Sequence, residues 1–127
     1  MTIPTDSTIL IVDDSNVIRN IVRKLLTQIG YSDIEEASDG GDALAKIHEK
    51  NYGLVISDWN MEPMNGQALL EHVRNERHFA KLPFIMMTAE SAVSKLINAK
   101  YAGVNSFINK PFNAEALKAK IDSIDVR

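Results

Sequence analysis

Short apolar runs alternate along the chain with stretches of helical spacing. Five runs rich in Val, Ile, Leu, Phe or Met have the length of buried strands and end at polar residues. These runs are Ile9–Val12, Ile34–Ala37, Leu54–Ser57, Phe84–Met87 and Ser106–Ile108. Each is followed by apolar positions three or four residues apart, which is typical of one face of an amphipathic helix. The pattern therefore predicts five strand–helix units.

The predicted helices differ in the length of their apolar stripes. The stripes are Ile18, Val22, Leu25 and Ile29 in the first helix, Leu44 and Ile47 in the second, Leu69, Leu70 and Val73 in the third, Val93, Leu96 and Ile97 in the fourth, and Leu117, Ile121 and Ile124 in the fifth. Gly30 and Gly103 are predicted to end the first and fourth helices. Parallel strands need crossover connections, so this alternation indicates an α/β fold with a doubly wound parallel sheet covered by helices on both faces.

The size and charge of the chain narrow the possible functions. With 127 residues, 45% of them hydrophobic and 24% charged, the chain is long enough for one domain and too short for two. No repeat or linker divides it, so we expect a single domain over residues 1–127 without an appended effector domain. The net charge of −3 offers no basic surface for a phosphate backbone, and nucleic acid is not an expected partner.

The chain contains no cysteine. This excludes disulfides and thiol catalysis and fits a reducing compartment. Its first residues lack the basic start and apolar core of a signal peptide, and no run is long enough to span a bilayer. We expect a cytoplasmic protein that does not insert into membranes.

Three aspartates stand where predicted strands stop. Asp13 and Asp14 follow the first strand, and Asp58 follows the third. In an open α/β sheet the ligand crevice lies just beyond these strand ends. If the two strands are neighbours, three carboxylates share a pocket that requires a cation, and oxygen ligands without Cys or His favour Mg²⁺. A single Asp after a strand is more often a helix cap, and Asp14 or Ser15 could cap the first helix.

Complementary groups follow the remaining strands. Thr88 follows the fourth strand and Lys110 the fifth. A hydroxyl can donate a hydrogen bond to a transferred group, and an ammonium can neutralise its negative charge. Phosphoryl transfer needs such charge stabilisation, and Asp is a known phosphoryl acceptor. The combined set indicates phosphoryl transfer, although Thr88 or Lys110 alone would have no such meaning.

These residues resemble the receiver domains of two-component response regulators, in particular the single-domain chemotaxis regulators. The resemblance extends over nearly the whole chain, and the stretch from Ser57 to Met61 is its most specific part. The matching stretches are Ile9-Leu10-Ile11-Val12-Asp13-Asp14, Glu35-Glu36-Ala37 with Asp39-Gly40 and Asp42-Ala43-Leu44, Val55-Ile56-Ser57-Asp58-Trp59-Asn60-Met61, Thr88-Ala89-Glu90 and Lys110-Pro111-Phe112. The resemblance implies a flavodoxin-like (βα)5 fold with strand order 2-1-3-4-5.

The resemblance also implies a role for each site residue. Asp58 would accept a phosphoryl group from a histidine kinase. Asp13, Asp14, Asp58 and the backbone carbonyl of Asn60 would arrange Mg²⁺, and Lys110 would pair with the phosphoryl oxygens. The peptide bond between Lys110 and Pro111 is expected to be cis, as it usually is in this family.

A conformational switch is the second implication. Thr88 would move to hydrogen-bond the phosphoryl group, and the ring of Phe107 would swing inward. The surface formed by the fourth helix, fifth strand and fifth helix would then bind an output partner, such as the flagellar motor switch. A phosphatase is a further possible partner.

The sequence departs from the family pattern at two positions. Phe107 replaces the Tyr of the chemotaxis regulators, so coupling by ring packing is available and coupling by a phenolic hydroxyl is not. In the loop Met61-Glu62-Pro63-Met64-Asn65-Gly66, Pro comes one residue later than usual, and Glu62 takes its place. Glu62, together with the flanking residues Trp59, Asn60 and Glu90, could alter phosphodonor access or the lifetime of the phosphorylated state.

Two other functions stay open. The protein could be a phosphate sink or phosphorelay intermediate that never contacts the motor, which the replacement of Tyr by Phe107 favours. It could also be a Mg²⁺-dependent phosphohydrolase that acts through an aspartyl-phosphate, although 127 residues leave little room for a substrate-covering cap. We expect that it is not an enzyme with external substrates and that it catalyses only its own phosphorylation and dephosphorylation.

Overall fold

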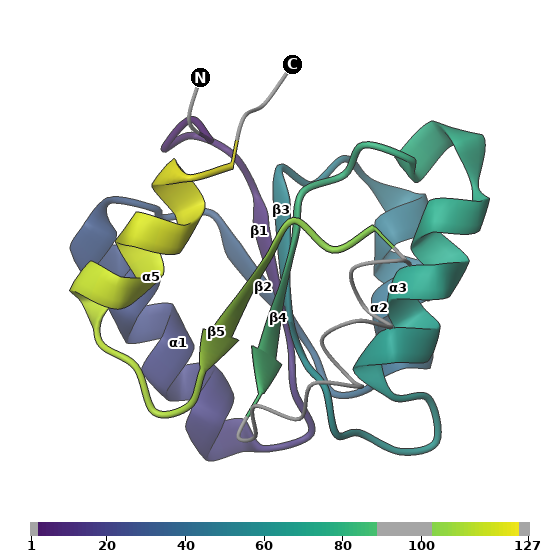
Figure 1. Ribbon diagram of the computed structural model, residues 1–127, viewed down its shortest axis with the longest axis horizontal. Coiled ribbons are helices and arrows are strands. Elements are labelled where there is room, and N and C mark those ends of the chain that lie inside the picture. The colour runs from purple at the N-terminus through teal and green to yellow at the C-terminus, as the bar shows by residue number, and fades with distance from the viewer. Residues whose placement is uncertain (1–2, 89–102, 125–127) are drawn as a thin grey trace.

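Five parallel strands form one sheet in the order β2-β1-β3-β4-β5 (Figure 1). The structure is a computed structural model that describes residues 3–88 and 103–124. The strands are β1 (Ile9–Val12), β2 (Ile34–Ala37), β3 (Leu54–Asp58), β4 (Phe84–Thr88) and β5 (Ser106–Asn109). The predicted α/β class and the strand order are confirmed. Because all pairings are parallel, the carboxyl ends of the strands lie along one edge of the sheet.

Helices cover both faces of the sheet. They are α1 (Asn16–Ile29), α2 (Gly40–Glu49), α3 (Gly66–Asn75) and α5 (Ala114–Asp122), with a short 3₁₀ helix η1 (Arg77–Phe79) after α3. In Figure 1, α1 and α5 lie side by side on one face, and α2 and α3 lie on the other. The helix predicted around Val93 and the site residue Glu90 lie outside the described residues. Within the described part of the chain, no helix has both the length and the apolarity needed to cross a bilayer.

The two core layers follow from the alternation of side chains along the strands. In β1, Ile9 and Ile11 belong to the core under α1 and α5, whereas Leu10 and Val12 belong to the core under α2 and α3. All four side chains have no exposed surface. A strand buried on both faces has no polar side to show, which explains its continuous apolar run.

The start of α1 shows which residue after β1, Asp14 or Ser15, caps the helix. The hydroxyl of Ser15 accepts a hydrogen bond from the backbone N–H of Ile18 at 3.2 Å, so Ser15 is the N-cap. Asp14 is therefore not needed as a cap and lies exposed beside it. Gly30 ends the helix as predicted, with a φ of 128° that side chains rarely adopt.

Some predicted element ends are wrong by a residue or two. Asp58 and Thr88 are the last residues of β3 and β4 rather than the residues that follow, because both remain in the backbone pairing of the sheet. Conversely, α5 ends at Asp122, before Ile124, although the Ile124 side chain is buried. The carboxylate of Asp58 and the hydroxyl of Thr88 thus stand on rigid strands.

Candidate functional site

Three carboxylates meet at the carboxyl ends of β1 and β3. Asp13, Asp14 and Asp58 each place one oxygen within 4.8 Å of the others. They converge because β1 and β3 are neighbours, with Val12 level with Ser57. Asp13 and Asp58 are buried, with 1% and 5% of their surface exposed, whereas Asp14 is exposed. The cluster therefore has a buried floor and one open side toward solvent.

Lys110 neutralises part of this charge. Its ammonium lies 2.8 Å from Oδ1 of Asp58 and 3.4 Å from Oδ2 of Asp13. Lys110 follows β5, which is separated from β3 by β4, so the side chain reaches across one strand. Its backbone N–H donates to the carbonyl of Thr88 at 2.8 Å, and its peptide bond to Pro111 is cis, as expected.

The pKa values of the buried groups reflect this crowding. Burial is the largest effect on Asp13 and raises its pKa, and the nearby charge of Asp58 raises it further. The hydrogen bond from the backbone N–H of Ser15, at 2.9 Å, and the charge of Lys110 oppose that shift without cancelling it. For Lys110 burial is again the largest effect and lowers the pKa, but the hydrogen bond to Asp58 and the charges of both aspartates raise it above its usual value. The raised pKa of Lys110 means that the site favours its charged ammonium, and the raised pKa of Asp13 means that the site disfavours a negative charge on that carboxyl group.

The donor set fits Mg²⁺. The three clustered side chains offer hard carboxylate oxygens, which suit Mg²⁺ or Ca²⁺ better than a softer metal. Among the described residues, three carboxylates opposed by the ammonium of Lys110 leave two negative charges when all are ionised, which a divalent cation would balance. The exposed side of the cluster, at Asp14, leaves room for water or phosphate ligands. Asn60, whose backbone carbonyl is the fourth expected ligand, lies exposed two residues beyond Asp58.

The loop between β3 and α3 passes very close to Asp58. The backbone N–H of Gly66 donates to the carbonyl of Trp59 at 2.9 Å. A Cβ atom at position 66 would lie 2.3 Å from the backbone carbonyl oxygen of Asp58, so only glycine allows this approach. Local sequence patterns do not reveal this role of Gly66, because the close contact arises only when the loop folds back. Trp59, the first residue of this loop, is buried, and Glu62 is exposed.

Thr88 and Phe107 occupy neighbouring strands. Thr88 is buried at the carboxyl end of β4, one residue beyond Met87, the partner of Asp58 in the sheet. Phe107 lies in β5, level with Met86 of β4. Its half-buried ring packs against the core under α2 and α3. Thr88 therefore lies one strand away from Asp58, and Phe107 lies on the next strand, β5. The movement itself stays a prediction.

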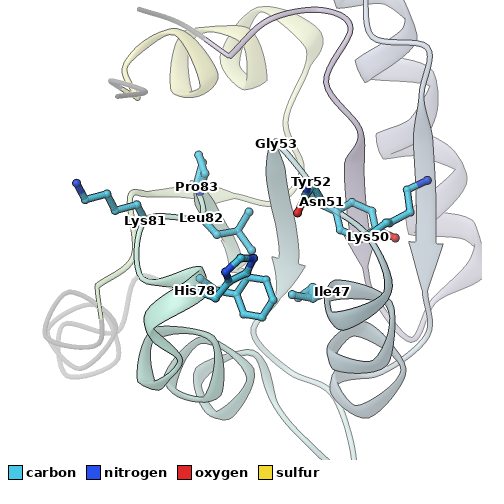
Figure 2. A pocket seen from close by; sticks show the side chains of 10 residues that line it. Ile47, Lys50, Asn51, Tyr52, Gly53, His78, Lys81, Leu82 and Pro83 are labelled. Carbon is cyan, nitrogen blue, oxygen red and sulfur yellow. The ribbon is translucent and has the colours of Figure 1, made fainter.

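A separate pocket lies at the other end of the sheet (Figure 2). It has a volume of about 310 Å³, and its lining includes Tyr52, Gly53, His78 and Pro83. Gly53 and Pro83 come just before β3 and β4, whereas Asp58 and Thr88 end those strands. The pocket therefore does not belong to the acidic site.

Known proteins resemble this chain over most of its length. Residues 9–122 match the response regulator receiver domain family. The chain is 43% identical over 116 residues to the chemotaxis protein CheY of Pseudomonas aeruginosa, which covers 91% of this chain and 94% of that protein. Chemotaxis protein CheY-3 of Vibrio cholerae is also 43% identical over 116 residues, covering 91% of this chain and 89% of that protein. In the structure of the chemotaxis response regulator CheY4 of Vibrio cholerae, the fold agrees with a TM-score of 0.86 at 36% identity, over 94% of this chain and 100% of that one.

Proposed function

The chain belongs to the response regulator receiver domain family and is closely related to the CheY chemotaxis regulators, and on that premise we propose that it is a stand-alone phosphoacceptor switch. Asp58 accepts a phosphoryl group from a histidine kinase. One observation carries this proposal: the carboxylate of Asp58 sits in a three-carboxylate cluster with the ammonium of Lys110 only 2.8 Å from its oxygen. The proposed nucleophile, the candidate Mg²⁺ ligands and a balancing ammonium therefore lie together, which supports the proposal.

The proposed reaction is a phosphoryl transfer between two side chains. An oxygen of Asp58 attacks the phosphorus, and the bond from phosphorus to the imidazole nitrogen of the donor histidine breaks. Lys110 pairs with the phosphoryl oxygens, since its ammonium already lies against the carboxylate of Asp58. Asp13, Asp14, Asp58 and the carbonyl of Asn60 would hold Mg²⁺, which when bound neutralises charge on the phosphoryl oxygens.

The proposed output is a change of the surface that includes β5 and α5. The hydroxyl of Thr88 hydrogen-bonds the phosphoryl group, and the half-buried ring of Phe107 follows by packing more deeply. Shifting a two-state equilibrium from 1:99 to 99:1 needs about 5.5 kcal/mol of differential stabilisation, which charged hydrogen bonds to a phosphoryl group are able to supply. The expected partner is the flagellar motor switch, with a phosphatase as a possible further partner.

The protein would act in the cytoplasm and would have no external substrate. It would catalyse only its own phosphorylation and dephosphorylation. The replacement of the family's Tyr by Phe107 favours one alternative output, a phosphate sink or phosphorelay intermediate that does not contact the motor. Binding of the beryllofluoride-treated protein to motor switch protein, compared with binding to histidine kinase, separates the two outputs.

Phosphorylation of purified protein by acetyl phosphate tests the central claim. We expect up to one equivalent of alkali-labile, hydroxylamine-sensitive phosphate in the unaltered protein and none in Asp58→Asn. The matched control is Asp6→Asn, because Asp6 is exposed in the segment before β1, at the opposite end of the sheet. Labelling of Asp58→Asn at the level of the control would refute the assignment.

A further inference from the structure

We propose that Arg19 is a positioning residue that fixes the peptide between Asp13 and Asp14 and thereby sets the affinity for Mg²⁺; this inference rests on the Mg²⁺ site of the proposed function. Arg19 lies on α1 and points back toward the end of β1. It contacts no carboxylate of the acidic cluster directly. Its effect is exerted through the backbone that carries two of the three carboxylates.

Three nitrogens of the Arg19 guanidinium have hydrogen-bond partners. Nη1 donates to the backbone carbonyl of Asp13 at 2.5 Å. Nε donates to Oε1 of Glu36 at 2.9 Å, and Nη2 donates to the side chain of Asn16 at 3.2 Å. Only 16% of the side-chain surface is exposed. A planar group held at three points has little freedom to rotate, so the position of the Asp13 carbonyl is closely defined.

The carbonyl of Asp13 controls the direction of both neighbouring carboxylates. Asp13 stands beyond the last residue of β1, although its N–H still donates to the carbonyl of Ala37 at 3.1 Å. The carbonyl of Asp13 and the amide of Asp14 form one planar unit, so holding the oxygen fixes the orientation in which Asp14 leaves the strand. The N–H of Ser15 then holds Oδ1 of Asp13 at 2.9 Å. Arg19 and Ser15 together define the separation of the two carboxylates.

Glu36 anchors the guanidinium from the sheet. Its second oxygen accepts a hydrogen bond from Nε of Arg23 at 2.8 Å, and Nη2 of Arg23 donates to the carbonyl of Ile34. Burial is the largest effect on Glu36 and raises its pKa, but the two arginines outweigh it and lower the pKa. The carboxyl group of Glu36 is therefore ionised at neutral pH. It places Arg19 and also neutralises much of its charge.

The geometry and the charge of Arg19 predict opposite changes in the affinity for Mg²⁺ when Arg19 is removed. If Arg19 acted only as a nearby cation, it would repel Mg²⁺, and its removal would tighten binding. If it positions the Asp13–Asp14 peptide, its removal weakens binding, because the ligands lose their preorganised separation. The sign of the change therefore distinguishes the two roles.

Mg²⁺ titration of Arg19→Gln, followed by Trp59 fluorescence and checked by calorimetry, tests the proposal. We expect about tenfold weaker binding, the usual effect of losing a group that orients a metal ligand. The matched control is Arg23→Gln, because Arg23 is one helical turn away and shares Glu36 but donates no hydrogen bond to Asp13. It should change the affinity by less than about twofold. Unchanged or tighter binding in Arg19→Gln would overturn the proposal.

A conservative variant and a metal-free measurement complete the design. Arg19→Lys keeps the charge but not the three-point geometry, so it should also weaken Mg²⁺ binding, and it replaces Arg19→Gln in the test if that variant does not fold. Without metal, the amide hydrogen of Ser15 should exchange faster in the Arg19 variant and not in Arg23→Gln. A folded wild-type protein that binds no Mg²⁺ would count against the proposed function, whereas equal binding by wild type and both Arg19 variants would refute only the role of Arg19.

Discussion

Lys110 and Asp58 form an ion pair across an intervening strand. The ammonium nitrogen lies 2.8 Å from Oδ1 of Asp58, and the two residues come from the ends of β5 and β3, with β4 between them. The same ammonium lies 3.4 Å from Asp13. One cation therefore holds two buried carboxylates that would otherwise repel each other, and the first predictions concern this arrangement.

Replacing Lys110 should destabilise the protein when Mg²⁺ is absent. Lys110→Gln leaves Asp13 and Asp58 facing each other, at a cost of about 1–3 kcal/mol, less than for a fully buried pair because 21% of the lysine side chain is exposed. Urea unfolding at neutral pH measures the change. The control is Lys118→Gln, since Lys118 pairs with Asp122 on the surface of α5 and should contribute less than about 0.5 kcal/mol. Equal effects of the two variants would contradict the role given to Lys110.

Neutralising Asp13 should have the opposite effect on stability. Its pKa is raised mainly by burial and further by Asp58, so the ionised carboxylate lowers the free energy of unfolding at neutral pH. Asp13→Asn should therefore stabilise the metal-free protein by on the order of 1 kcal/mol and remove most of the stabilisation by Mg²⁺. Thermal unfolding with and without Mg²⁺ measures both effects. A less stable Asp13→Asn protein would show that the contact with Lys110 outweighs burial.

Mg²⁺ binding should weaken as the solution becomes acidic. In the folded protein Asp13 takes up a proton at a pH above 3.8, the ordinary value for its carboxyl group, and a protonated carboxyl is a poor ligand. As pH falls through that window, the metal-free protein gains stability from Asp13 while its affinity for Mg²⁺ declines. Calorimetric titrations between about pH 7 and about pH 4 follow the affinity. An affinity that stays constant over this range would exclude Asp13 as a ligand.

A methyl group at position 66 should disturb Asp58, the proposed phosphoacceptor. The added Cβ would lie 2.3 Å from the carbonyl oxygen of Asp58, and backbone cannot move aside easily. We expect Gly66→Ala to lose about 2–3 kcal/mol of stability and to be phosphorylated more slowly by acetyl phosphate. Gly41→Ala serves as the control, because its Cβ would meet the nearest atom at 3.4 Å. Denaturant unfolding of both variants measures the change in the free energy of unfolding. Similar losses in the two variants would argue against the close approach of Gly66 to the Asp58 carbonyl.

The ring of Phe107 should transmit the signal without taking part in the chemistry. Phe107→Ala is expected to retain labelling of Asp58 within about twofold, because the ring lies in β5 and is not part of the acidic cluster. Phosphorylation should no longer increase binding to the output partner. Phe107→Tyr keeps the ring and should preserve that increase. Partner affinities with and without beryllofluoride test this, and a normal increase in Phe107→Ala would exclude a switching role.

The sequence contained most of the fold because its signals are local. The apolar run Ile9–Val12 and the stripe through Val22 each depend on neighbours a few residues away, and the strand and helix lie where these patterns predicted. The positions of Asp13 and Asp58 at the strand ends followed from the same reasoning. The strand order, the predicted movement of Thr88 and the predicted switching role of Phe107 came only from the family resemblance.

The tertiary structure alone decided how the site is supported. Lys110 and Asp13 are 97 residues apart in sequence, and no local pattern determines that their side chains meet. The close approach of Gly66 to Asp58 and the contact of Arg19 with the Asp13 carbonyl likewise depend on how loops and helices return to the sheet. Strand and helix periodicity specifies which face of an element is buried. Hydrogen bonds between distant segments form only when the packed sheet brings donor and acceptor within about 3 Å of each other.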